Sequence, residues 1–214
     1  MQIDTDSIIQ RLTGALNGEL PGKNAHRTMM PQGRDLERMA NTEPRLSAVL
    51  LLLYIDTGKL YITMIKRAEY DGVHSGQIAF PGGKKEEDDD NLRMTALRET
   101  YEEVGIRQED VKMIGKLTPL FIPVSNMCVH PWVGFHRHKP FFVKQDKEVQ
   151  QVLSLPLGNL LEESAVGTDT FEGLNYRIEA PCYNVNGYKV WGATAMILNE
   201  FIEVWRSSDE SGLA

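Results

Sequence analysis

The sequence is poor in cysteine, with Cys128 and Cys182 alone among 214 residues. Two cysteines cannot form a disulfide framework, and neither belongs to a Cys-x-x-Cys pair of the kind that binds zinc. The longest apolar run, residues 48–55, falls well short of the roughly 20 residues of a membrane-spanning helix. The N-terminus also lacks the charged and then apolar pattern of a secretory signal. We therefore expect a protein of a reducing, cytoplasmic compartment with no membrane partner.

A surplus of basic residues is missing as well. The chain has 23 Lys and Arg against 30 Asp and Glu, which gives a net charge of −7. Because binding to a nucleic-acid backbone depends on a Lys/Arg surplus, we expect no nucleic-acid partner. An acidic protein can still bind an anionic substrate when metal ions screen the charge.

Hydrophobic periodicity predicts helices and strands in mixed order. Helices are predicted over residues 5–17, 91–104, 156–164 and 192–206. Strands are predicted over residues 46–55, 60–67, 111–121, 129–137 and 141–149, followed by a hairpin with Asn186 and Gly187 at its turn. Residues 68–90 are expected to form a long loop, and Gly105 to end the second helix.

This mixture predicts the α/β class, as a sandwich of helices around a mixed sheet. With no internal repeat, the length suits one domain with extensions. We expect a helix and connecting arm over residues 1–44, a domain over 45–206 and a disordered tail over 207–214.

The predicted second helix carries a dense group of carboxylates. Glu99, Glu102 and Glu103 fall within an arc of about 100° on a helix. The opposite side is predicted to face the core with Met94, Leu97, Tyr101 and Val104. Carboxylates crowded in this way favour a divalent cation, and without a nearby His or Cys they favour Mg²⁺ or Mn²⁺ over zinc. The alternative is a solvated acidic face, in which Arg98 and Glu102 pair four residues apart.

The segment before the helix favours the metal site. Gly82 and Gly83, in the sequence Phe-Pro-Gly-Gly, permit close approach of the backbone to a ligand or metal. From Gly83 onward the sequence resembles the Nudix box, which reads Gly, five residues, Glu, seven residues, then Arg-Glu-apolar-x-Glu-Glu-x-Gly-apolar. The residues that match its second half are Arg98, Glu99, Glu102, Glu103, Gly105 and Ile106.

The first half of the box departs from this pattern. The interval from Gly83 to Arg98 is one residue longer than usual. Asp89 or Asp90, from the acidic run 86–90, stands in for the first glutamate, and Thr100 occupies a normally apolar position.

The upstream sequence resembles the signature of one group in this family, the coenzyme A pyrophosphatases. The matching residues are Arg67, Ala68, Gly76, Phe80, Pro81, Gly82 and Gly83. Gly72 stands where that signature has a second arginine, and His74 stands where the group often has a histidine. A box longer by one residue also occurs in the group, whose C-terminal helix is similar to the ending "VWGATAMIL". The resemblance covers residues 45–205.

This resemblance implies a Nudix-type α/β/α sandwich and Mg²⁺- or Mn²⁺-dependent hydrolysis of the pyrophosphate bond in coenzyme A or its thioesters. The products would be 4′-phosphopantetheine, or its acyl form, and adenosine 3′,5′-bisphosphate. The partner is thus a small nucleoside diphosphate derivative, and the N-terminal arm allows a homodimer. Two alternatives stay open: a Nudix enzyme acting on ADP-ribose, a dinucleotide or a nucleoside triphosphate, and a Nudix binding module without catalysis.

The resemblance also implies roles for individual residues. The metal ligands would be Glu99, Glu102 and Glu103, with the Gly83 carbonyl as a further possibility. The catalytic residues would be Glu102 and Arg98, the arginine acting by orienting a glutamate. The substrate-binding residues would be Arg67, Gly82 and Gly83. The base that takes the proton of water would be one of the helix glutamates or a carboxylate outside the helix, for which Glu148 is a candidate.

Overall fold

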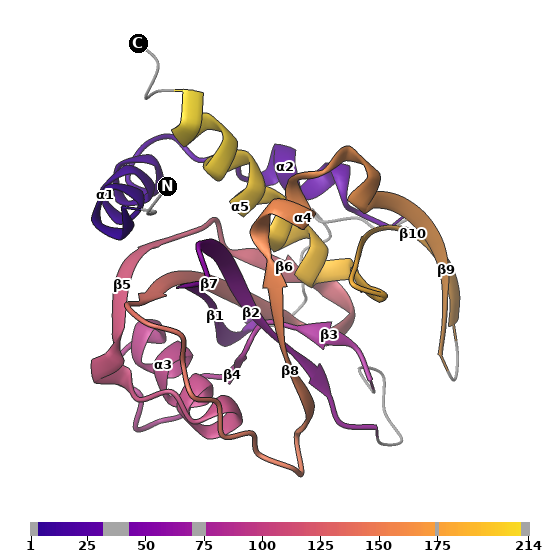
Figure 1. Ribbon diagram of the computed structural model, residues 1–214. Coiled ribbons are helices and arrows are strands. Elements are labelled where there is room, and N and C mark those ends of the chain that lie inside the picture. The colour runs from indigo at the N-terminus through magenta and orange to yellow at the C-terminus, as the bar shows by residue number, and fades with distance from the viewer. Residues whose placement is uncertain (1–3, 32–42, 70–75, 174–175, 211–214) are drawn as a thin grey trace.

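The computed structural model describes residues 4–31, 43–69, 76–173 and 176–210 (Figure 1). Its α-helices are α1 (Thr5–Leu16), α2 (Lys23–Thr28), α3 (Leu92–Val104), α4 (Leu157–Leu161) and α5 (Gly192–Glu210). Short 3₁₀ turns are η1 (Gln108–Asp110), η2 (Pro123–Ser125) and η3 (Glu163–Ala165). The strands are β1 (Arg45–Asp56), β2 (Lys59–Arg67), β3 (Ile78–Ala79), β4 (Gly82–Lys84), β5 (Val111–Lys116), β6 (Leu120–Ile122), β7 (Met127–His136), β8 (Val149–Pro156), β9 (Val166–Gly173), β10 (Tyr176–Val185) and β11 (Tyr188–Trp191). Among these described residues, no helix is long and apolar enough to cross a membrane.

Eight strands form a mixed central sheet. Five of them follow the order β3-β2-β1-β7-β5, while β4 pairs with β1, β6 with β7 and β8 with β2. Strands β1 and β7 are parallel, and the other pairs are antiparallel. The hairpin between β1 and β2 turns at Thr57 and Gly58, which both have positive φ as a tight two-residue turn requires. A second, antiparallel sheet has the order β11-β10-β9.

Strand β1 supplies the core on both faces of the central sheet. Leu51 and Leu53 belong to the cluster beneath α5, whereas Leu50 and Leu52 belong to the cluster beneath α3. Successive side chains of a strand point to opposite faces, so a continuous run of leucines suits a strand covered on both sides. Burying each such side chain contributes about 1.5–3 kcal/mol.

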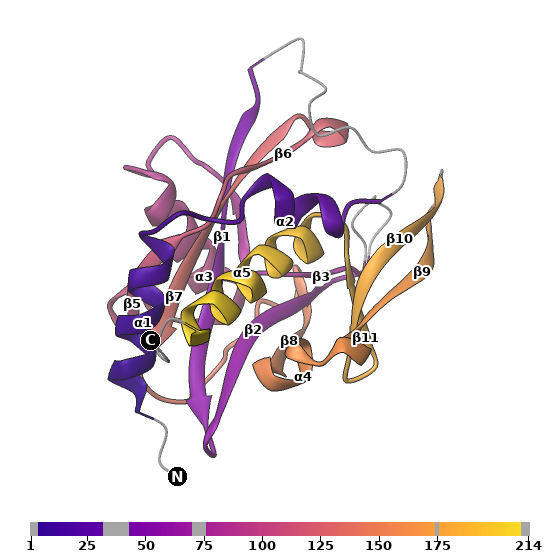
Figure 2. The ribbon, with the colours of Figure 1, turned by 90° about the horizontal axis from the view of Figure 1, so that it is seen from above.

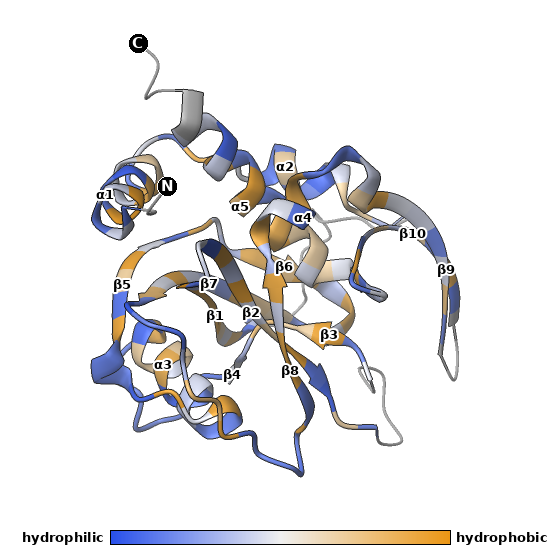
Figure 3. Cartoon of the chain, in the orientation of Figure 1, coloured by the Kyte–Doolittle hydropathy of each residue, from blue (hydrophilic) through white to orange (hydrophobic). Residues whose placement is uncertain are grey.

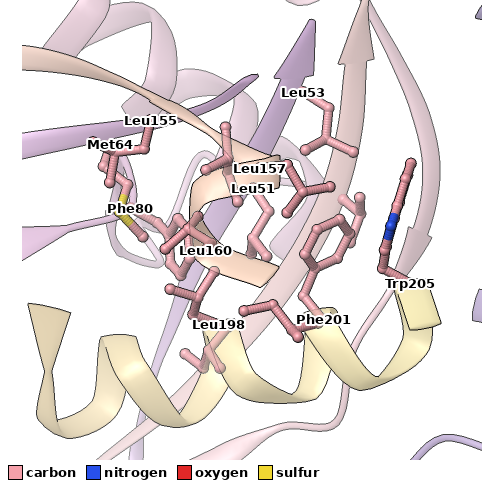
Figure 4. Close-up of a cluster of buried hydrophobic side chains, with 14 of the residues drawn as sticks. Leu51, Leu53, Met64, Phe80, Leu155, Leu157, Leu160, Leu198, Phe201 and Trp205 are labelled. Carbon is pink, nitrogen blue, oxygen red and sulfur yellow. The ribbon is translucent and has the colours of Figure 1, made fainter. Parts of the chain in front are cut away.

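The helices therefore form two layers, with α3 on one face of the sheet and α5, α1 and α2 on the other. Figure 2 shows α5 lying across the strands with α1 and α2 beside it. From α5, Leu198, Phe201 and Trp205 extend toward the leucines of β1 (Figure 4). In Figure 3 the strands of the central sheet carry much of the hydrophobic colour, whereas β9 is largely hydrophilic. The predicted α/β/α sandwich around a mixed sheet is thus confirmed.

Several predicted elements differ in extent. The strand predicted over 141–149 is wrong: this segment is irregular, and β8 begins only at Val149. The strand predicted over 111–121 is divided into β5 and β6, because the Thr118 N–H turns to Glu200 and Pro119 has no N–H to donate.

Other elements lie where the periodicity gave no sign of them. The connecting arm that follows the first predicted helix, residues 18–44, contains α2. The loop predicted over residues 68–90 contains β3 and β4. Strand β9 is too polar to be recognised from its own sequence and depends on pairing with β10. Helix α5 continues to Glu210 rather than ending at residue 206, and residues 211–214 of the predicted tail lie outside the described residues.

Candidate active site

Helix α3 carries the three glutamates, and both of its ends are capped. Asn91 Oδ1 accepts hydrogen bonds from the N–H groups of Arg93 and Met94, both at 3.1 Å. These bonds satisfy two donors that the first turn of a helix leaves open. Gly105 ends the helix with φ +75°, and its N–H donates to the Tyr101 carbonyl at 2.9 Å. Glycine adopts this left-handed conformation without steric cost, as the sequence predicted for this position.

The buried face of α3 differs from the predicted one. Tyr101 is 56% exposed, so its predicted place on the core face is wrong. Thr100 is fully buried instead, and its hydroxyl donates to the Ala96 carbonyl at 2.7 Å. A hydroxyl bonded within its own helix can occupy an apolar position without leaving a buried donor unsatisfied. The face of α3 that buries Thr100 also buries the Glu103 side chain.

Glu103 is 2% exposed and lies at the contact between α3 and β4. Its Oε2 accepts a hydrogen bond from the Gly82 N–H at 2.9 Å, and its Oε1 is 3.9 Å from Nη1 of Arg67. Burial raises the pKa of Glu103 to about 7, and repulsion from Glu99 and Glu148 acts in the same direction. The Gly82 N–H and the Arg67 guanidinium oppose that rise but do not cancel it. The site thus holds a buried carboxylate whose charge lacks full compensation.

The two glycines of β4 are required by close contacts. At Gly82, with φ +153°, a Cβ atom would lie 2.3 Å from the carbonyl oxygen of Ala48 on β1. At Gly83, a Cβ atom would lie 2.3 Å from Oε1 of Glu99. The missing side chain therefore leaves space for a second carboxylate directly against the backbone. Burial also raises the pKa of Glu99, although the neighbouring Arg98 opposes the shift.

Arg98 connects the carboxylates of the site to one another. Its Nη1 donates to Glu102 Oε2 at 2.9 Å, and its Nη2 donates to Glu99 Oε1 at 3.1 Å. Nη2 also donates to the Lys84 carbonyl at 3.0 Å, which ties the helix to β4. Hydrogen bonds between charged groups are shorter and stronger than neutral ones, so Arg98 restrains the orientation of two glutamates. These hydrogen bonds would allow the orienting role predicted for Arg98, which stays a prediction.

Asp89 and Asp90 were both candidates to replace the first glutamate of the box, and the structure distinguishes them. Asp89 is 6% exposed and forms a bidentate pair with Arg98, Nε to Oδ1 and Nη2 to Oδ2, both at 3.0 Å. The guanidinium holds the pKa of Asp89 well below its ordinary value, despite burial. Asp90 is exposed. Asp89 is therefore the acidic residue that fixes Arg98.

Arg67, at the end of β2, directs its guanidinium into the same region. Its Nη1 approaches Glu103, and its buried Nε has no hydrogen-bond partner among the residues that the structure describes. A buried donor without a partner is costly. The Arg67 side chain as a whole is 31% exposed, so an anionic ligand can reach part of the guanidinium. The geometry is consistent with the predicted contact between Arg67 and a substrate phosphate.

Glu148 adds a fourth carboxylate to this region from outside the helix. It immediately precedes β8, and its carbonyl accepts a hydrogen bond from the Ala68 N–H at 2.8 Å. Its negative charge raises the pKa of both Glu99 and Glu103. The charge of Glu148 therefore lies near enough to the helix glutamates to repel them.

The donor set of the site fits a hard divalent cation. It consists of carboxylate oxygens, which Mg²⁺ and Mn²⁺ prefer. The Gly83 carbonyl stays a predicted further ligand. Within the described part of the chain, however, no three His, Cys, Asp or Glu side chains converge on one point. The Glu102 carboxylate accepts a hydrogen bond from Arg98, and the Glu103 carboxylate accepts one from the Gly82 N–H. Both carboxylates therefore already have protein partners. The ligand set of Glu99, Glu102 and Glu103 stays a prediction. Gly72 and His74 lie outside the described residues.

Solved structures share this arrangement of sheet and helices. RenU, a Nudix hydrolase from M. smegmatis, aligns over 85% of this chain and 94% of its own, with a TM-score of 0.53 and 10% identity. A MutT/nudix family protein from Enterococcus faecalis aligns over 98% of this chain and 76% of its own, with a TM-score of 0.51 and 15% identity. At these identities the likeness defines the class of fold, a mixed sheet flanked by helices.

Sequence comparison identifies the family. The family model of the NUDIX domain matches residues 44–165. Nudix hydrolase 15, mitochondrial, from Arabidopsis thaliana is 34% identical over 178 residues, which are 80% of this chain and 61% of that protein. The uncharacterized Nudix hydrolase NudL of Yersinia pestis is 35% identical over 158 residues, which are 73% of this chain and 78% of that protein. The chain belongs to the Nudix family, and it spans less than two thirds of the Arabidopsis relative.

Proposed function

We propose that this protein is a Nudix hydrolase that cleaves the diphosphate of coenzyme A or its thioesters, with Mg²⁺ or Mn²⁺. The observation that carries the proposal is the meeting of Arg67, Gly82 and Glu103 in one place. A guanidinium with an unsatisfied donor suits a phosphate, and a buried, incompletely compensated carboxylate suits a cation. A substrate diphosphate bridged by divalent metal requires both.

Bound divalent cations would neutralise the diphosphate and lower the pKa of a bound water. The glutamates of α3, Glu99, Glu102 and Glu103, would hold the cations. Arg98, fixed in turn by Asp89, keeps Glu99 and Glu102 in place through hydrogen bonds. Arg67 would bind a phosphate oxygen. Gly82 and Gly83 would contact the substrate only through the backbone of β4, because Ala48 and Glu99 fill the space that their side chains would take.

Two carboxylates are candidates for the base that takes the proton of water. Glu102 is half exposed, and its carboxylate pairs with Arg98. Glu148 is exposed and carries no ion pair among the described residues. A base must be within hydrogen-bond reach of the water and must be free to accept the proton, so this difference favours Glu148.

The coenzyme A specificity rests on the segment from Arg67 to Gly83, which resembles the signature of that group. ADP-ribose, dinucleotides and nucleoside triphosphates are the alternative substrates. A non-catalytic binding module is the least favoured alternative, because Glu99, Glu102 and Glu103 are all present and Glu103 contacts both Arg67 and Gly82.

Product analysis tests the proposal. The purified protein is incubated with Mg²⁺ or Mn²⁺ and coenzyme A, ADP-ribose, NADH or ATP, and the products are separated by chromatography. We expect adenosine 3′,5′-bisphosphate and 4′-phosphopantetheine from coenzyme A. Turnover of another diphosphate with coenzyme A intact would keep the chemistry and refute the specificity. No turnover of any of these substrates would favour the binding module.

A further inference from the structure

The segment between β7 and β8, residues 137–148, crosses the C-terminal end of α3, and we call it the strap (Figure 1). The Val143 N–H donates to the Val104 carbonyl, and the Gln145 N–H donates to the Glu103 carbonyl, both at 3.0 Å. The last carbonyls of a helix have no partner within the helix. The strap thus bonds to the backbone of the residue whose side chain is the buried carboxylate of the site.

Contacts with the central sheet hold the first half of the strap. The Phe142 ring meets the Tyr54 ring edge to face, with centroids 6.1 Å apart and planes at 64°. Tyr54 is 1% exposed, and Phe142 packs on the hydrophobic cluster beneath α3. Edge-to-face aromatic pairs stabilise a contact beyond the apolar area that they bury. Lys139 adds an ion pair with Asp56 at 2.8 Å.

Gly105 makes room for the strap where it crosses the helix. A Cβ atom at Gly105 would lie 2.8 Å from Cβ of Val143 and 3.0 Å from its carbonyl oxygen. This glycine therefore has two functions, since it ends α3 in the left-handed conformation and admits a second segment of chain against the helix end.

Beyond Gln145 the strap turns and reaches Glu148. The Gln145 carbonyl accepts hydrogen bonds from the N–H groups of Glu148 at 3.1 Å and Val149 at 2.8 Å. The N–H of Gln145 is already bound to Glu103. One residue therefore joins the backbone of Glu103 to the backbone of Glu148.

We propose that the strap positions Glu148 for catalysis and that Phe142 is the positioning residue that anchors it. The inference rests on the proposed function, in which Glu148 is the base. The strap after Phe142 is exposed, so its path depends on the Phe142 anchor, the two hydrogen bonds to α3 and, at Glu148 itself, the bond from the Ala68 N–H. A purely structural cap of α3 would affect stability but would not act through Glu148.

Neighbouring phenylalanines provide a matched pair of variants. Phe142 packs on Tyr54, whereas Phe141 is 86% exposed on the same strap. Because small misplacements of a catalytic group cost up to about 100-fold in rate, we expect Phe142→Ala to lower kcat by about 10- to 100-fold with KM nearly unchanged. Phe141→Ala should behave as wild type, and Phe142→Tyr, which keeps the ring, should restore kcat. Equal kcat values for the two alanine variants would overturn the proposal.

A double-mutant cycle tests whether Phe142 acts through Glu148. In a Glu148→Gln background, Phe142→Ala should cause little further loss of kcat, because the group it positions is already absent. If the two losses multiply, the strap does not act through Glu148 and the proposal fails. Should Phe142→Ala not fold, Phe142→Leu keeps apolar bulk and removes the ring contact, and the same cycle applies.

Hydrogen exchange separates this proposal from the proposed function. In Phe142→Ala the amides of Val143 and Gln145 should exchange faster than in wild type, whereas Phe141→Ala should leave both protected. Unchanged protection in Phe142→Ala would overturn the anchoring function of Phe142 whatever the activity. If the wild-type protein hydrolyses no diphosphate while the exchange result holds, the proposed function fails and the anchor stands.

Discussion

Glu103 and Glu200 lie in the two helical layers on opposite faces of the central sheet, and they are 2% and 0% exposed. On α5, Glu200 accepts a hydrogen bond from His26 Nε2 at 2.9 Å and further bonds from the Thr118 N–H at 3.1 and 3.2 Å. On α3, Glu103 accepts one backbone hydrogen bond, from Gly82, and its nearest cation, on Arg67, is 3.9 Å away.

The difference is the one expected between a structural carboxylate and a functional one. Glu200 joins α2, α5 and the segment after β5, and both of its oxygens are bonded. Glu103 has two like charges nearby, Glu99 and Glu148, and burial raises its pKa to about 7. Strongly shifted carboxylates beside a specific set of charges are typical of functional sites. Burial alone does not mark a site, whereas burial without sufficient partners does.

Glu103→Gln should give the largest effect. We expect turnover of coenzyme A with saturating Mg²⁺ to fall on the order of 1,000-fold, as the loss of several kcal/mol of transition-state stabilisation requires. The matched control is Glu200→Gln, the same change at the buried glutamate of the other layer, which should keep near-normal turnover per folded molecule. Similar losses in both variants would contradict the comparison.

Glu200→Ala should lower the free energy of unfolding more than Glu103→Gln does. The change leaves His26 and the Thr118 N–H buried without their acceptor, and breaking a buried pair of this kind costs about 3–5 kcal/mol. Urea unfolding measures the free energy. A loss below that of an ordinary surface substitution would show that the contact between α2 and α5 does not depend on Glu200.

The stability of the metal-free protein should depend on pH through Glu103. Its pKa is about 7 in the folded protein against an ordinary 4.5. The folded state binds this proton more tightly, so the contribution of Glu103 to stability is greatest below pH 4.5 and declines as pH rises through 7, by on the order of 3 kcal/mol. Thermal unfolding in a chelator should show this decline in wild type and a smaller one in Glu103→Gln. Equal slopes for the two proteins would contradict the uncompensated burial of Glu103.

Asp89→Asn should give the smallest of these effects. Removing one charge from the bidentate pair with Arg98 should cost about 2 kcal/mol at neutral pH. Because the folded pKa of Asp89 lies below its ordinary value of 3.8, its stabilisation is present above that pH and is lost as pH falls. The cost of the substitution should therefore shrink in acid. Asp90→Asn, one residue away and exposed, should be neutral, and equal costs would refute the choice of Asp89.

The fold was predictable where a local signal exists. The leucine run of β1, the turn at Thr57 and Gly58, and the Asn91 and Gly105 ends of α3 each follow from short-range sequence. The strand predicted over 141–149 failed because the N–H groups of Val143 and Gln145 bond to the end of a helix distant in sequence. A pairing of that kind leaves no trace in hydrophobic periodicity. The cytoplasmic location, the homodimer and the division into domains stay predictions.

The sequence by itself determined the family and the group of glutamates on α3, because spacing along one helix and two adjacent glycines are local properties. Only the tertiary structure decided that Glu103 is the buried member and that Asp89 rather than Asp90 holds Arg98, and only it brought the charge of Glu148 near Glu99 and Glu103. Those outcomes depend on which surfaces meet, since burial and the distance between charges arise when α3 packs on β1 and β4 and the strap crosses its end.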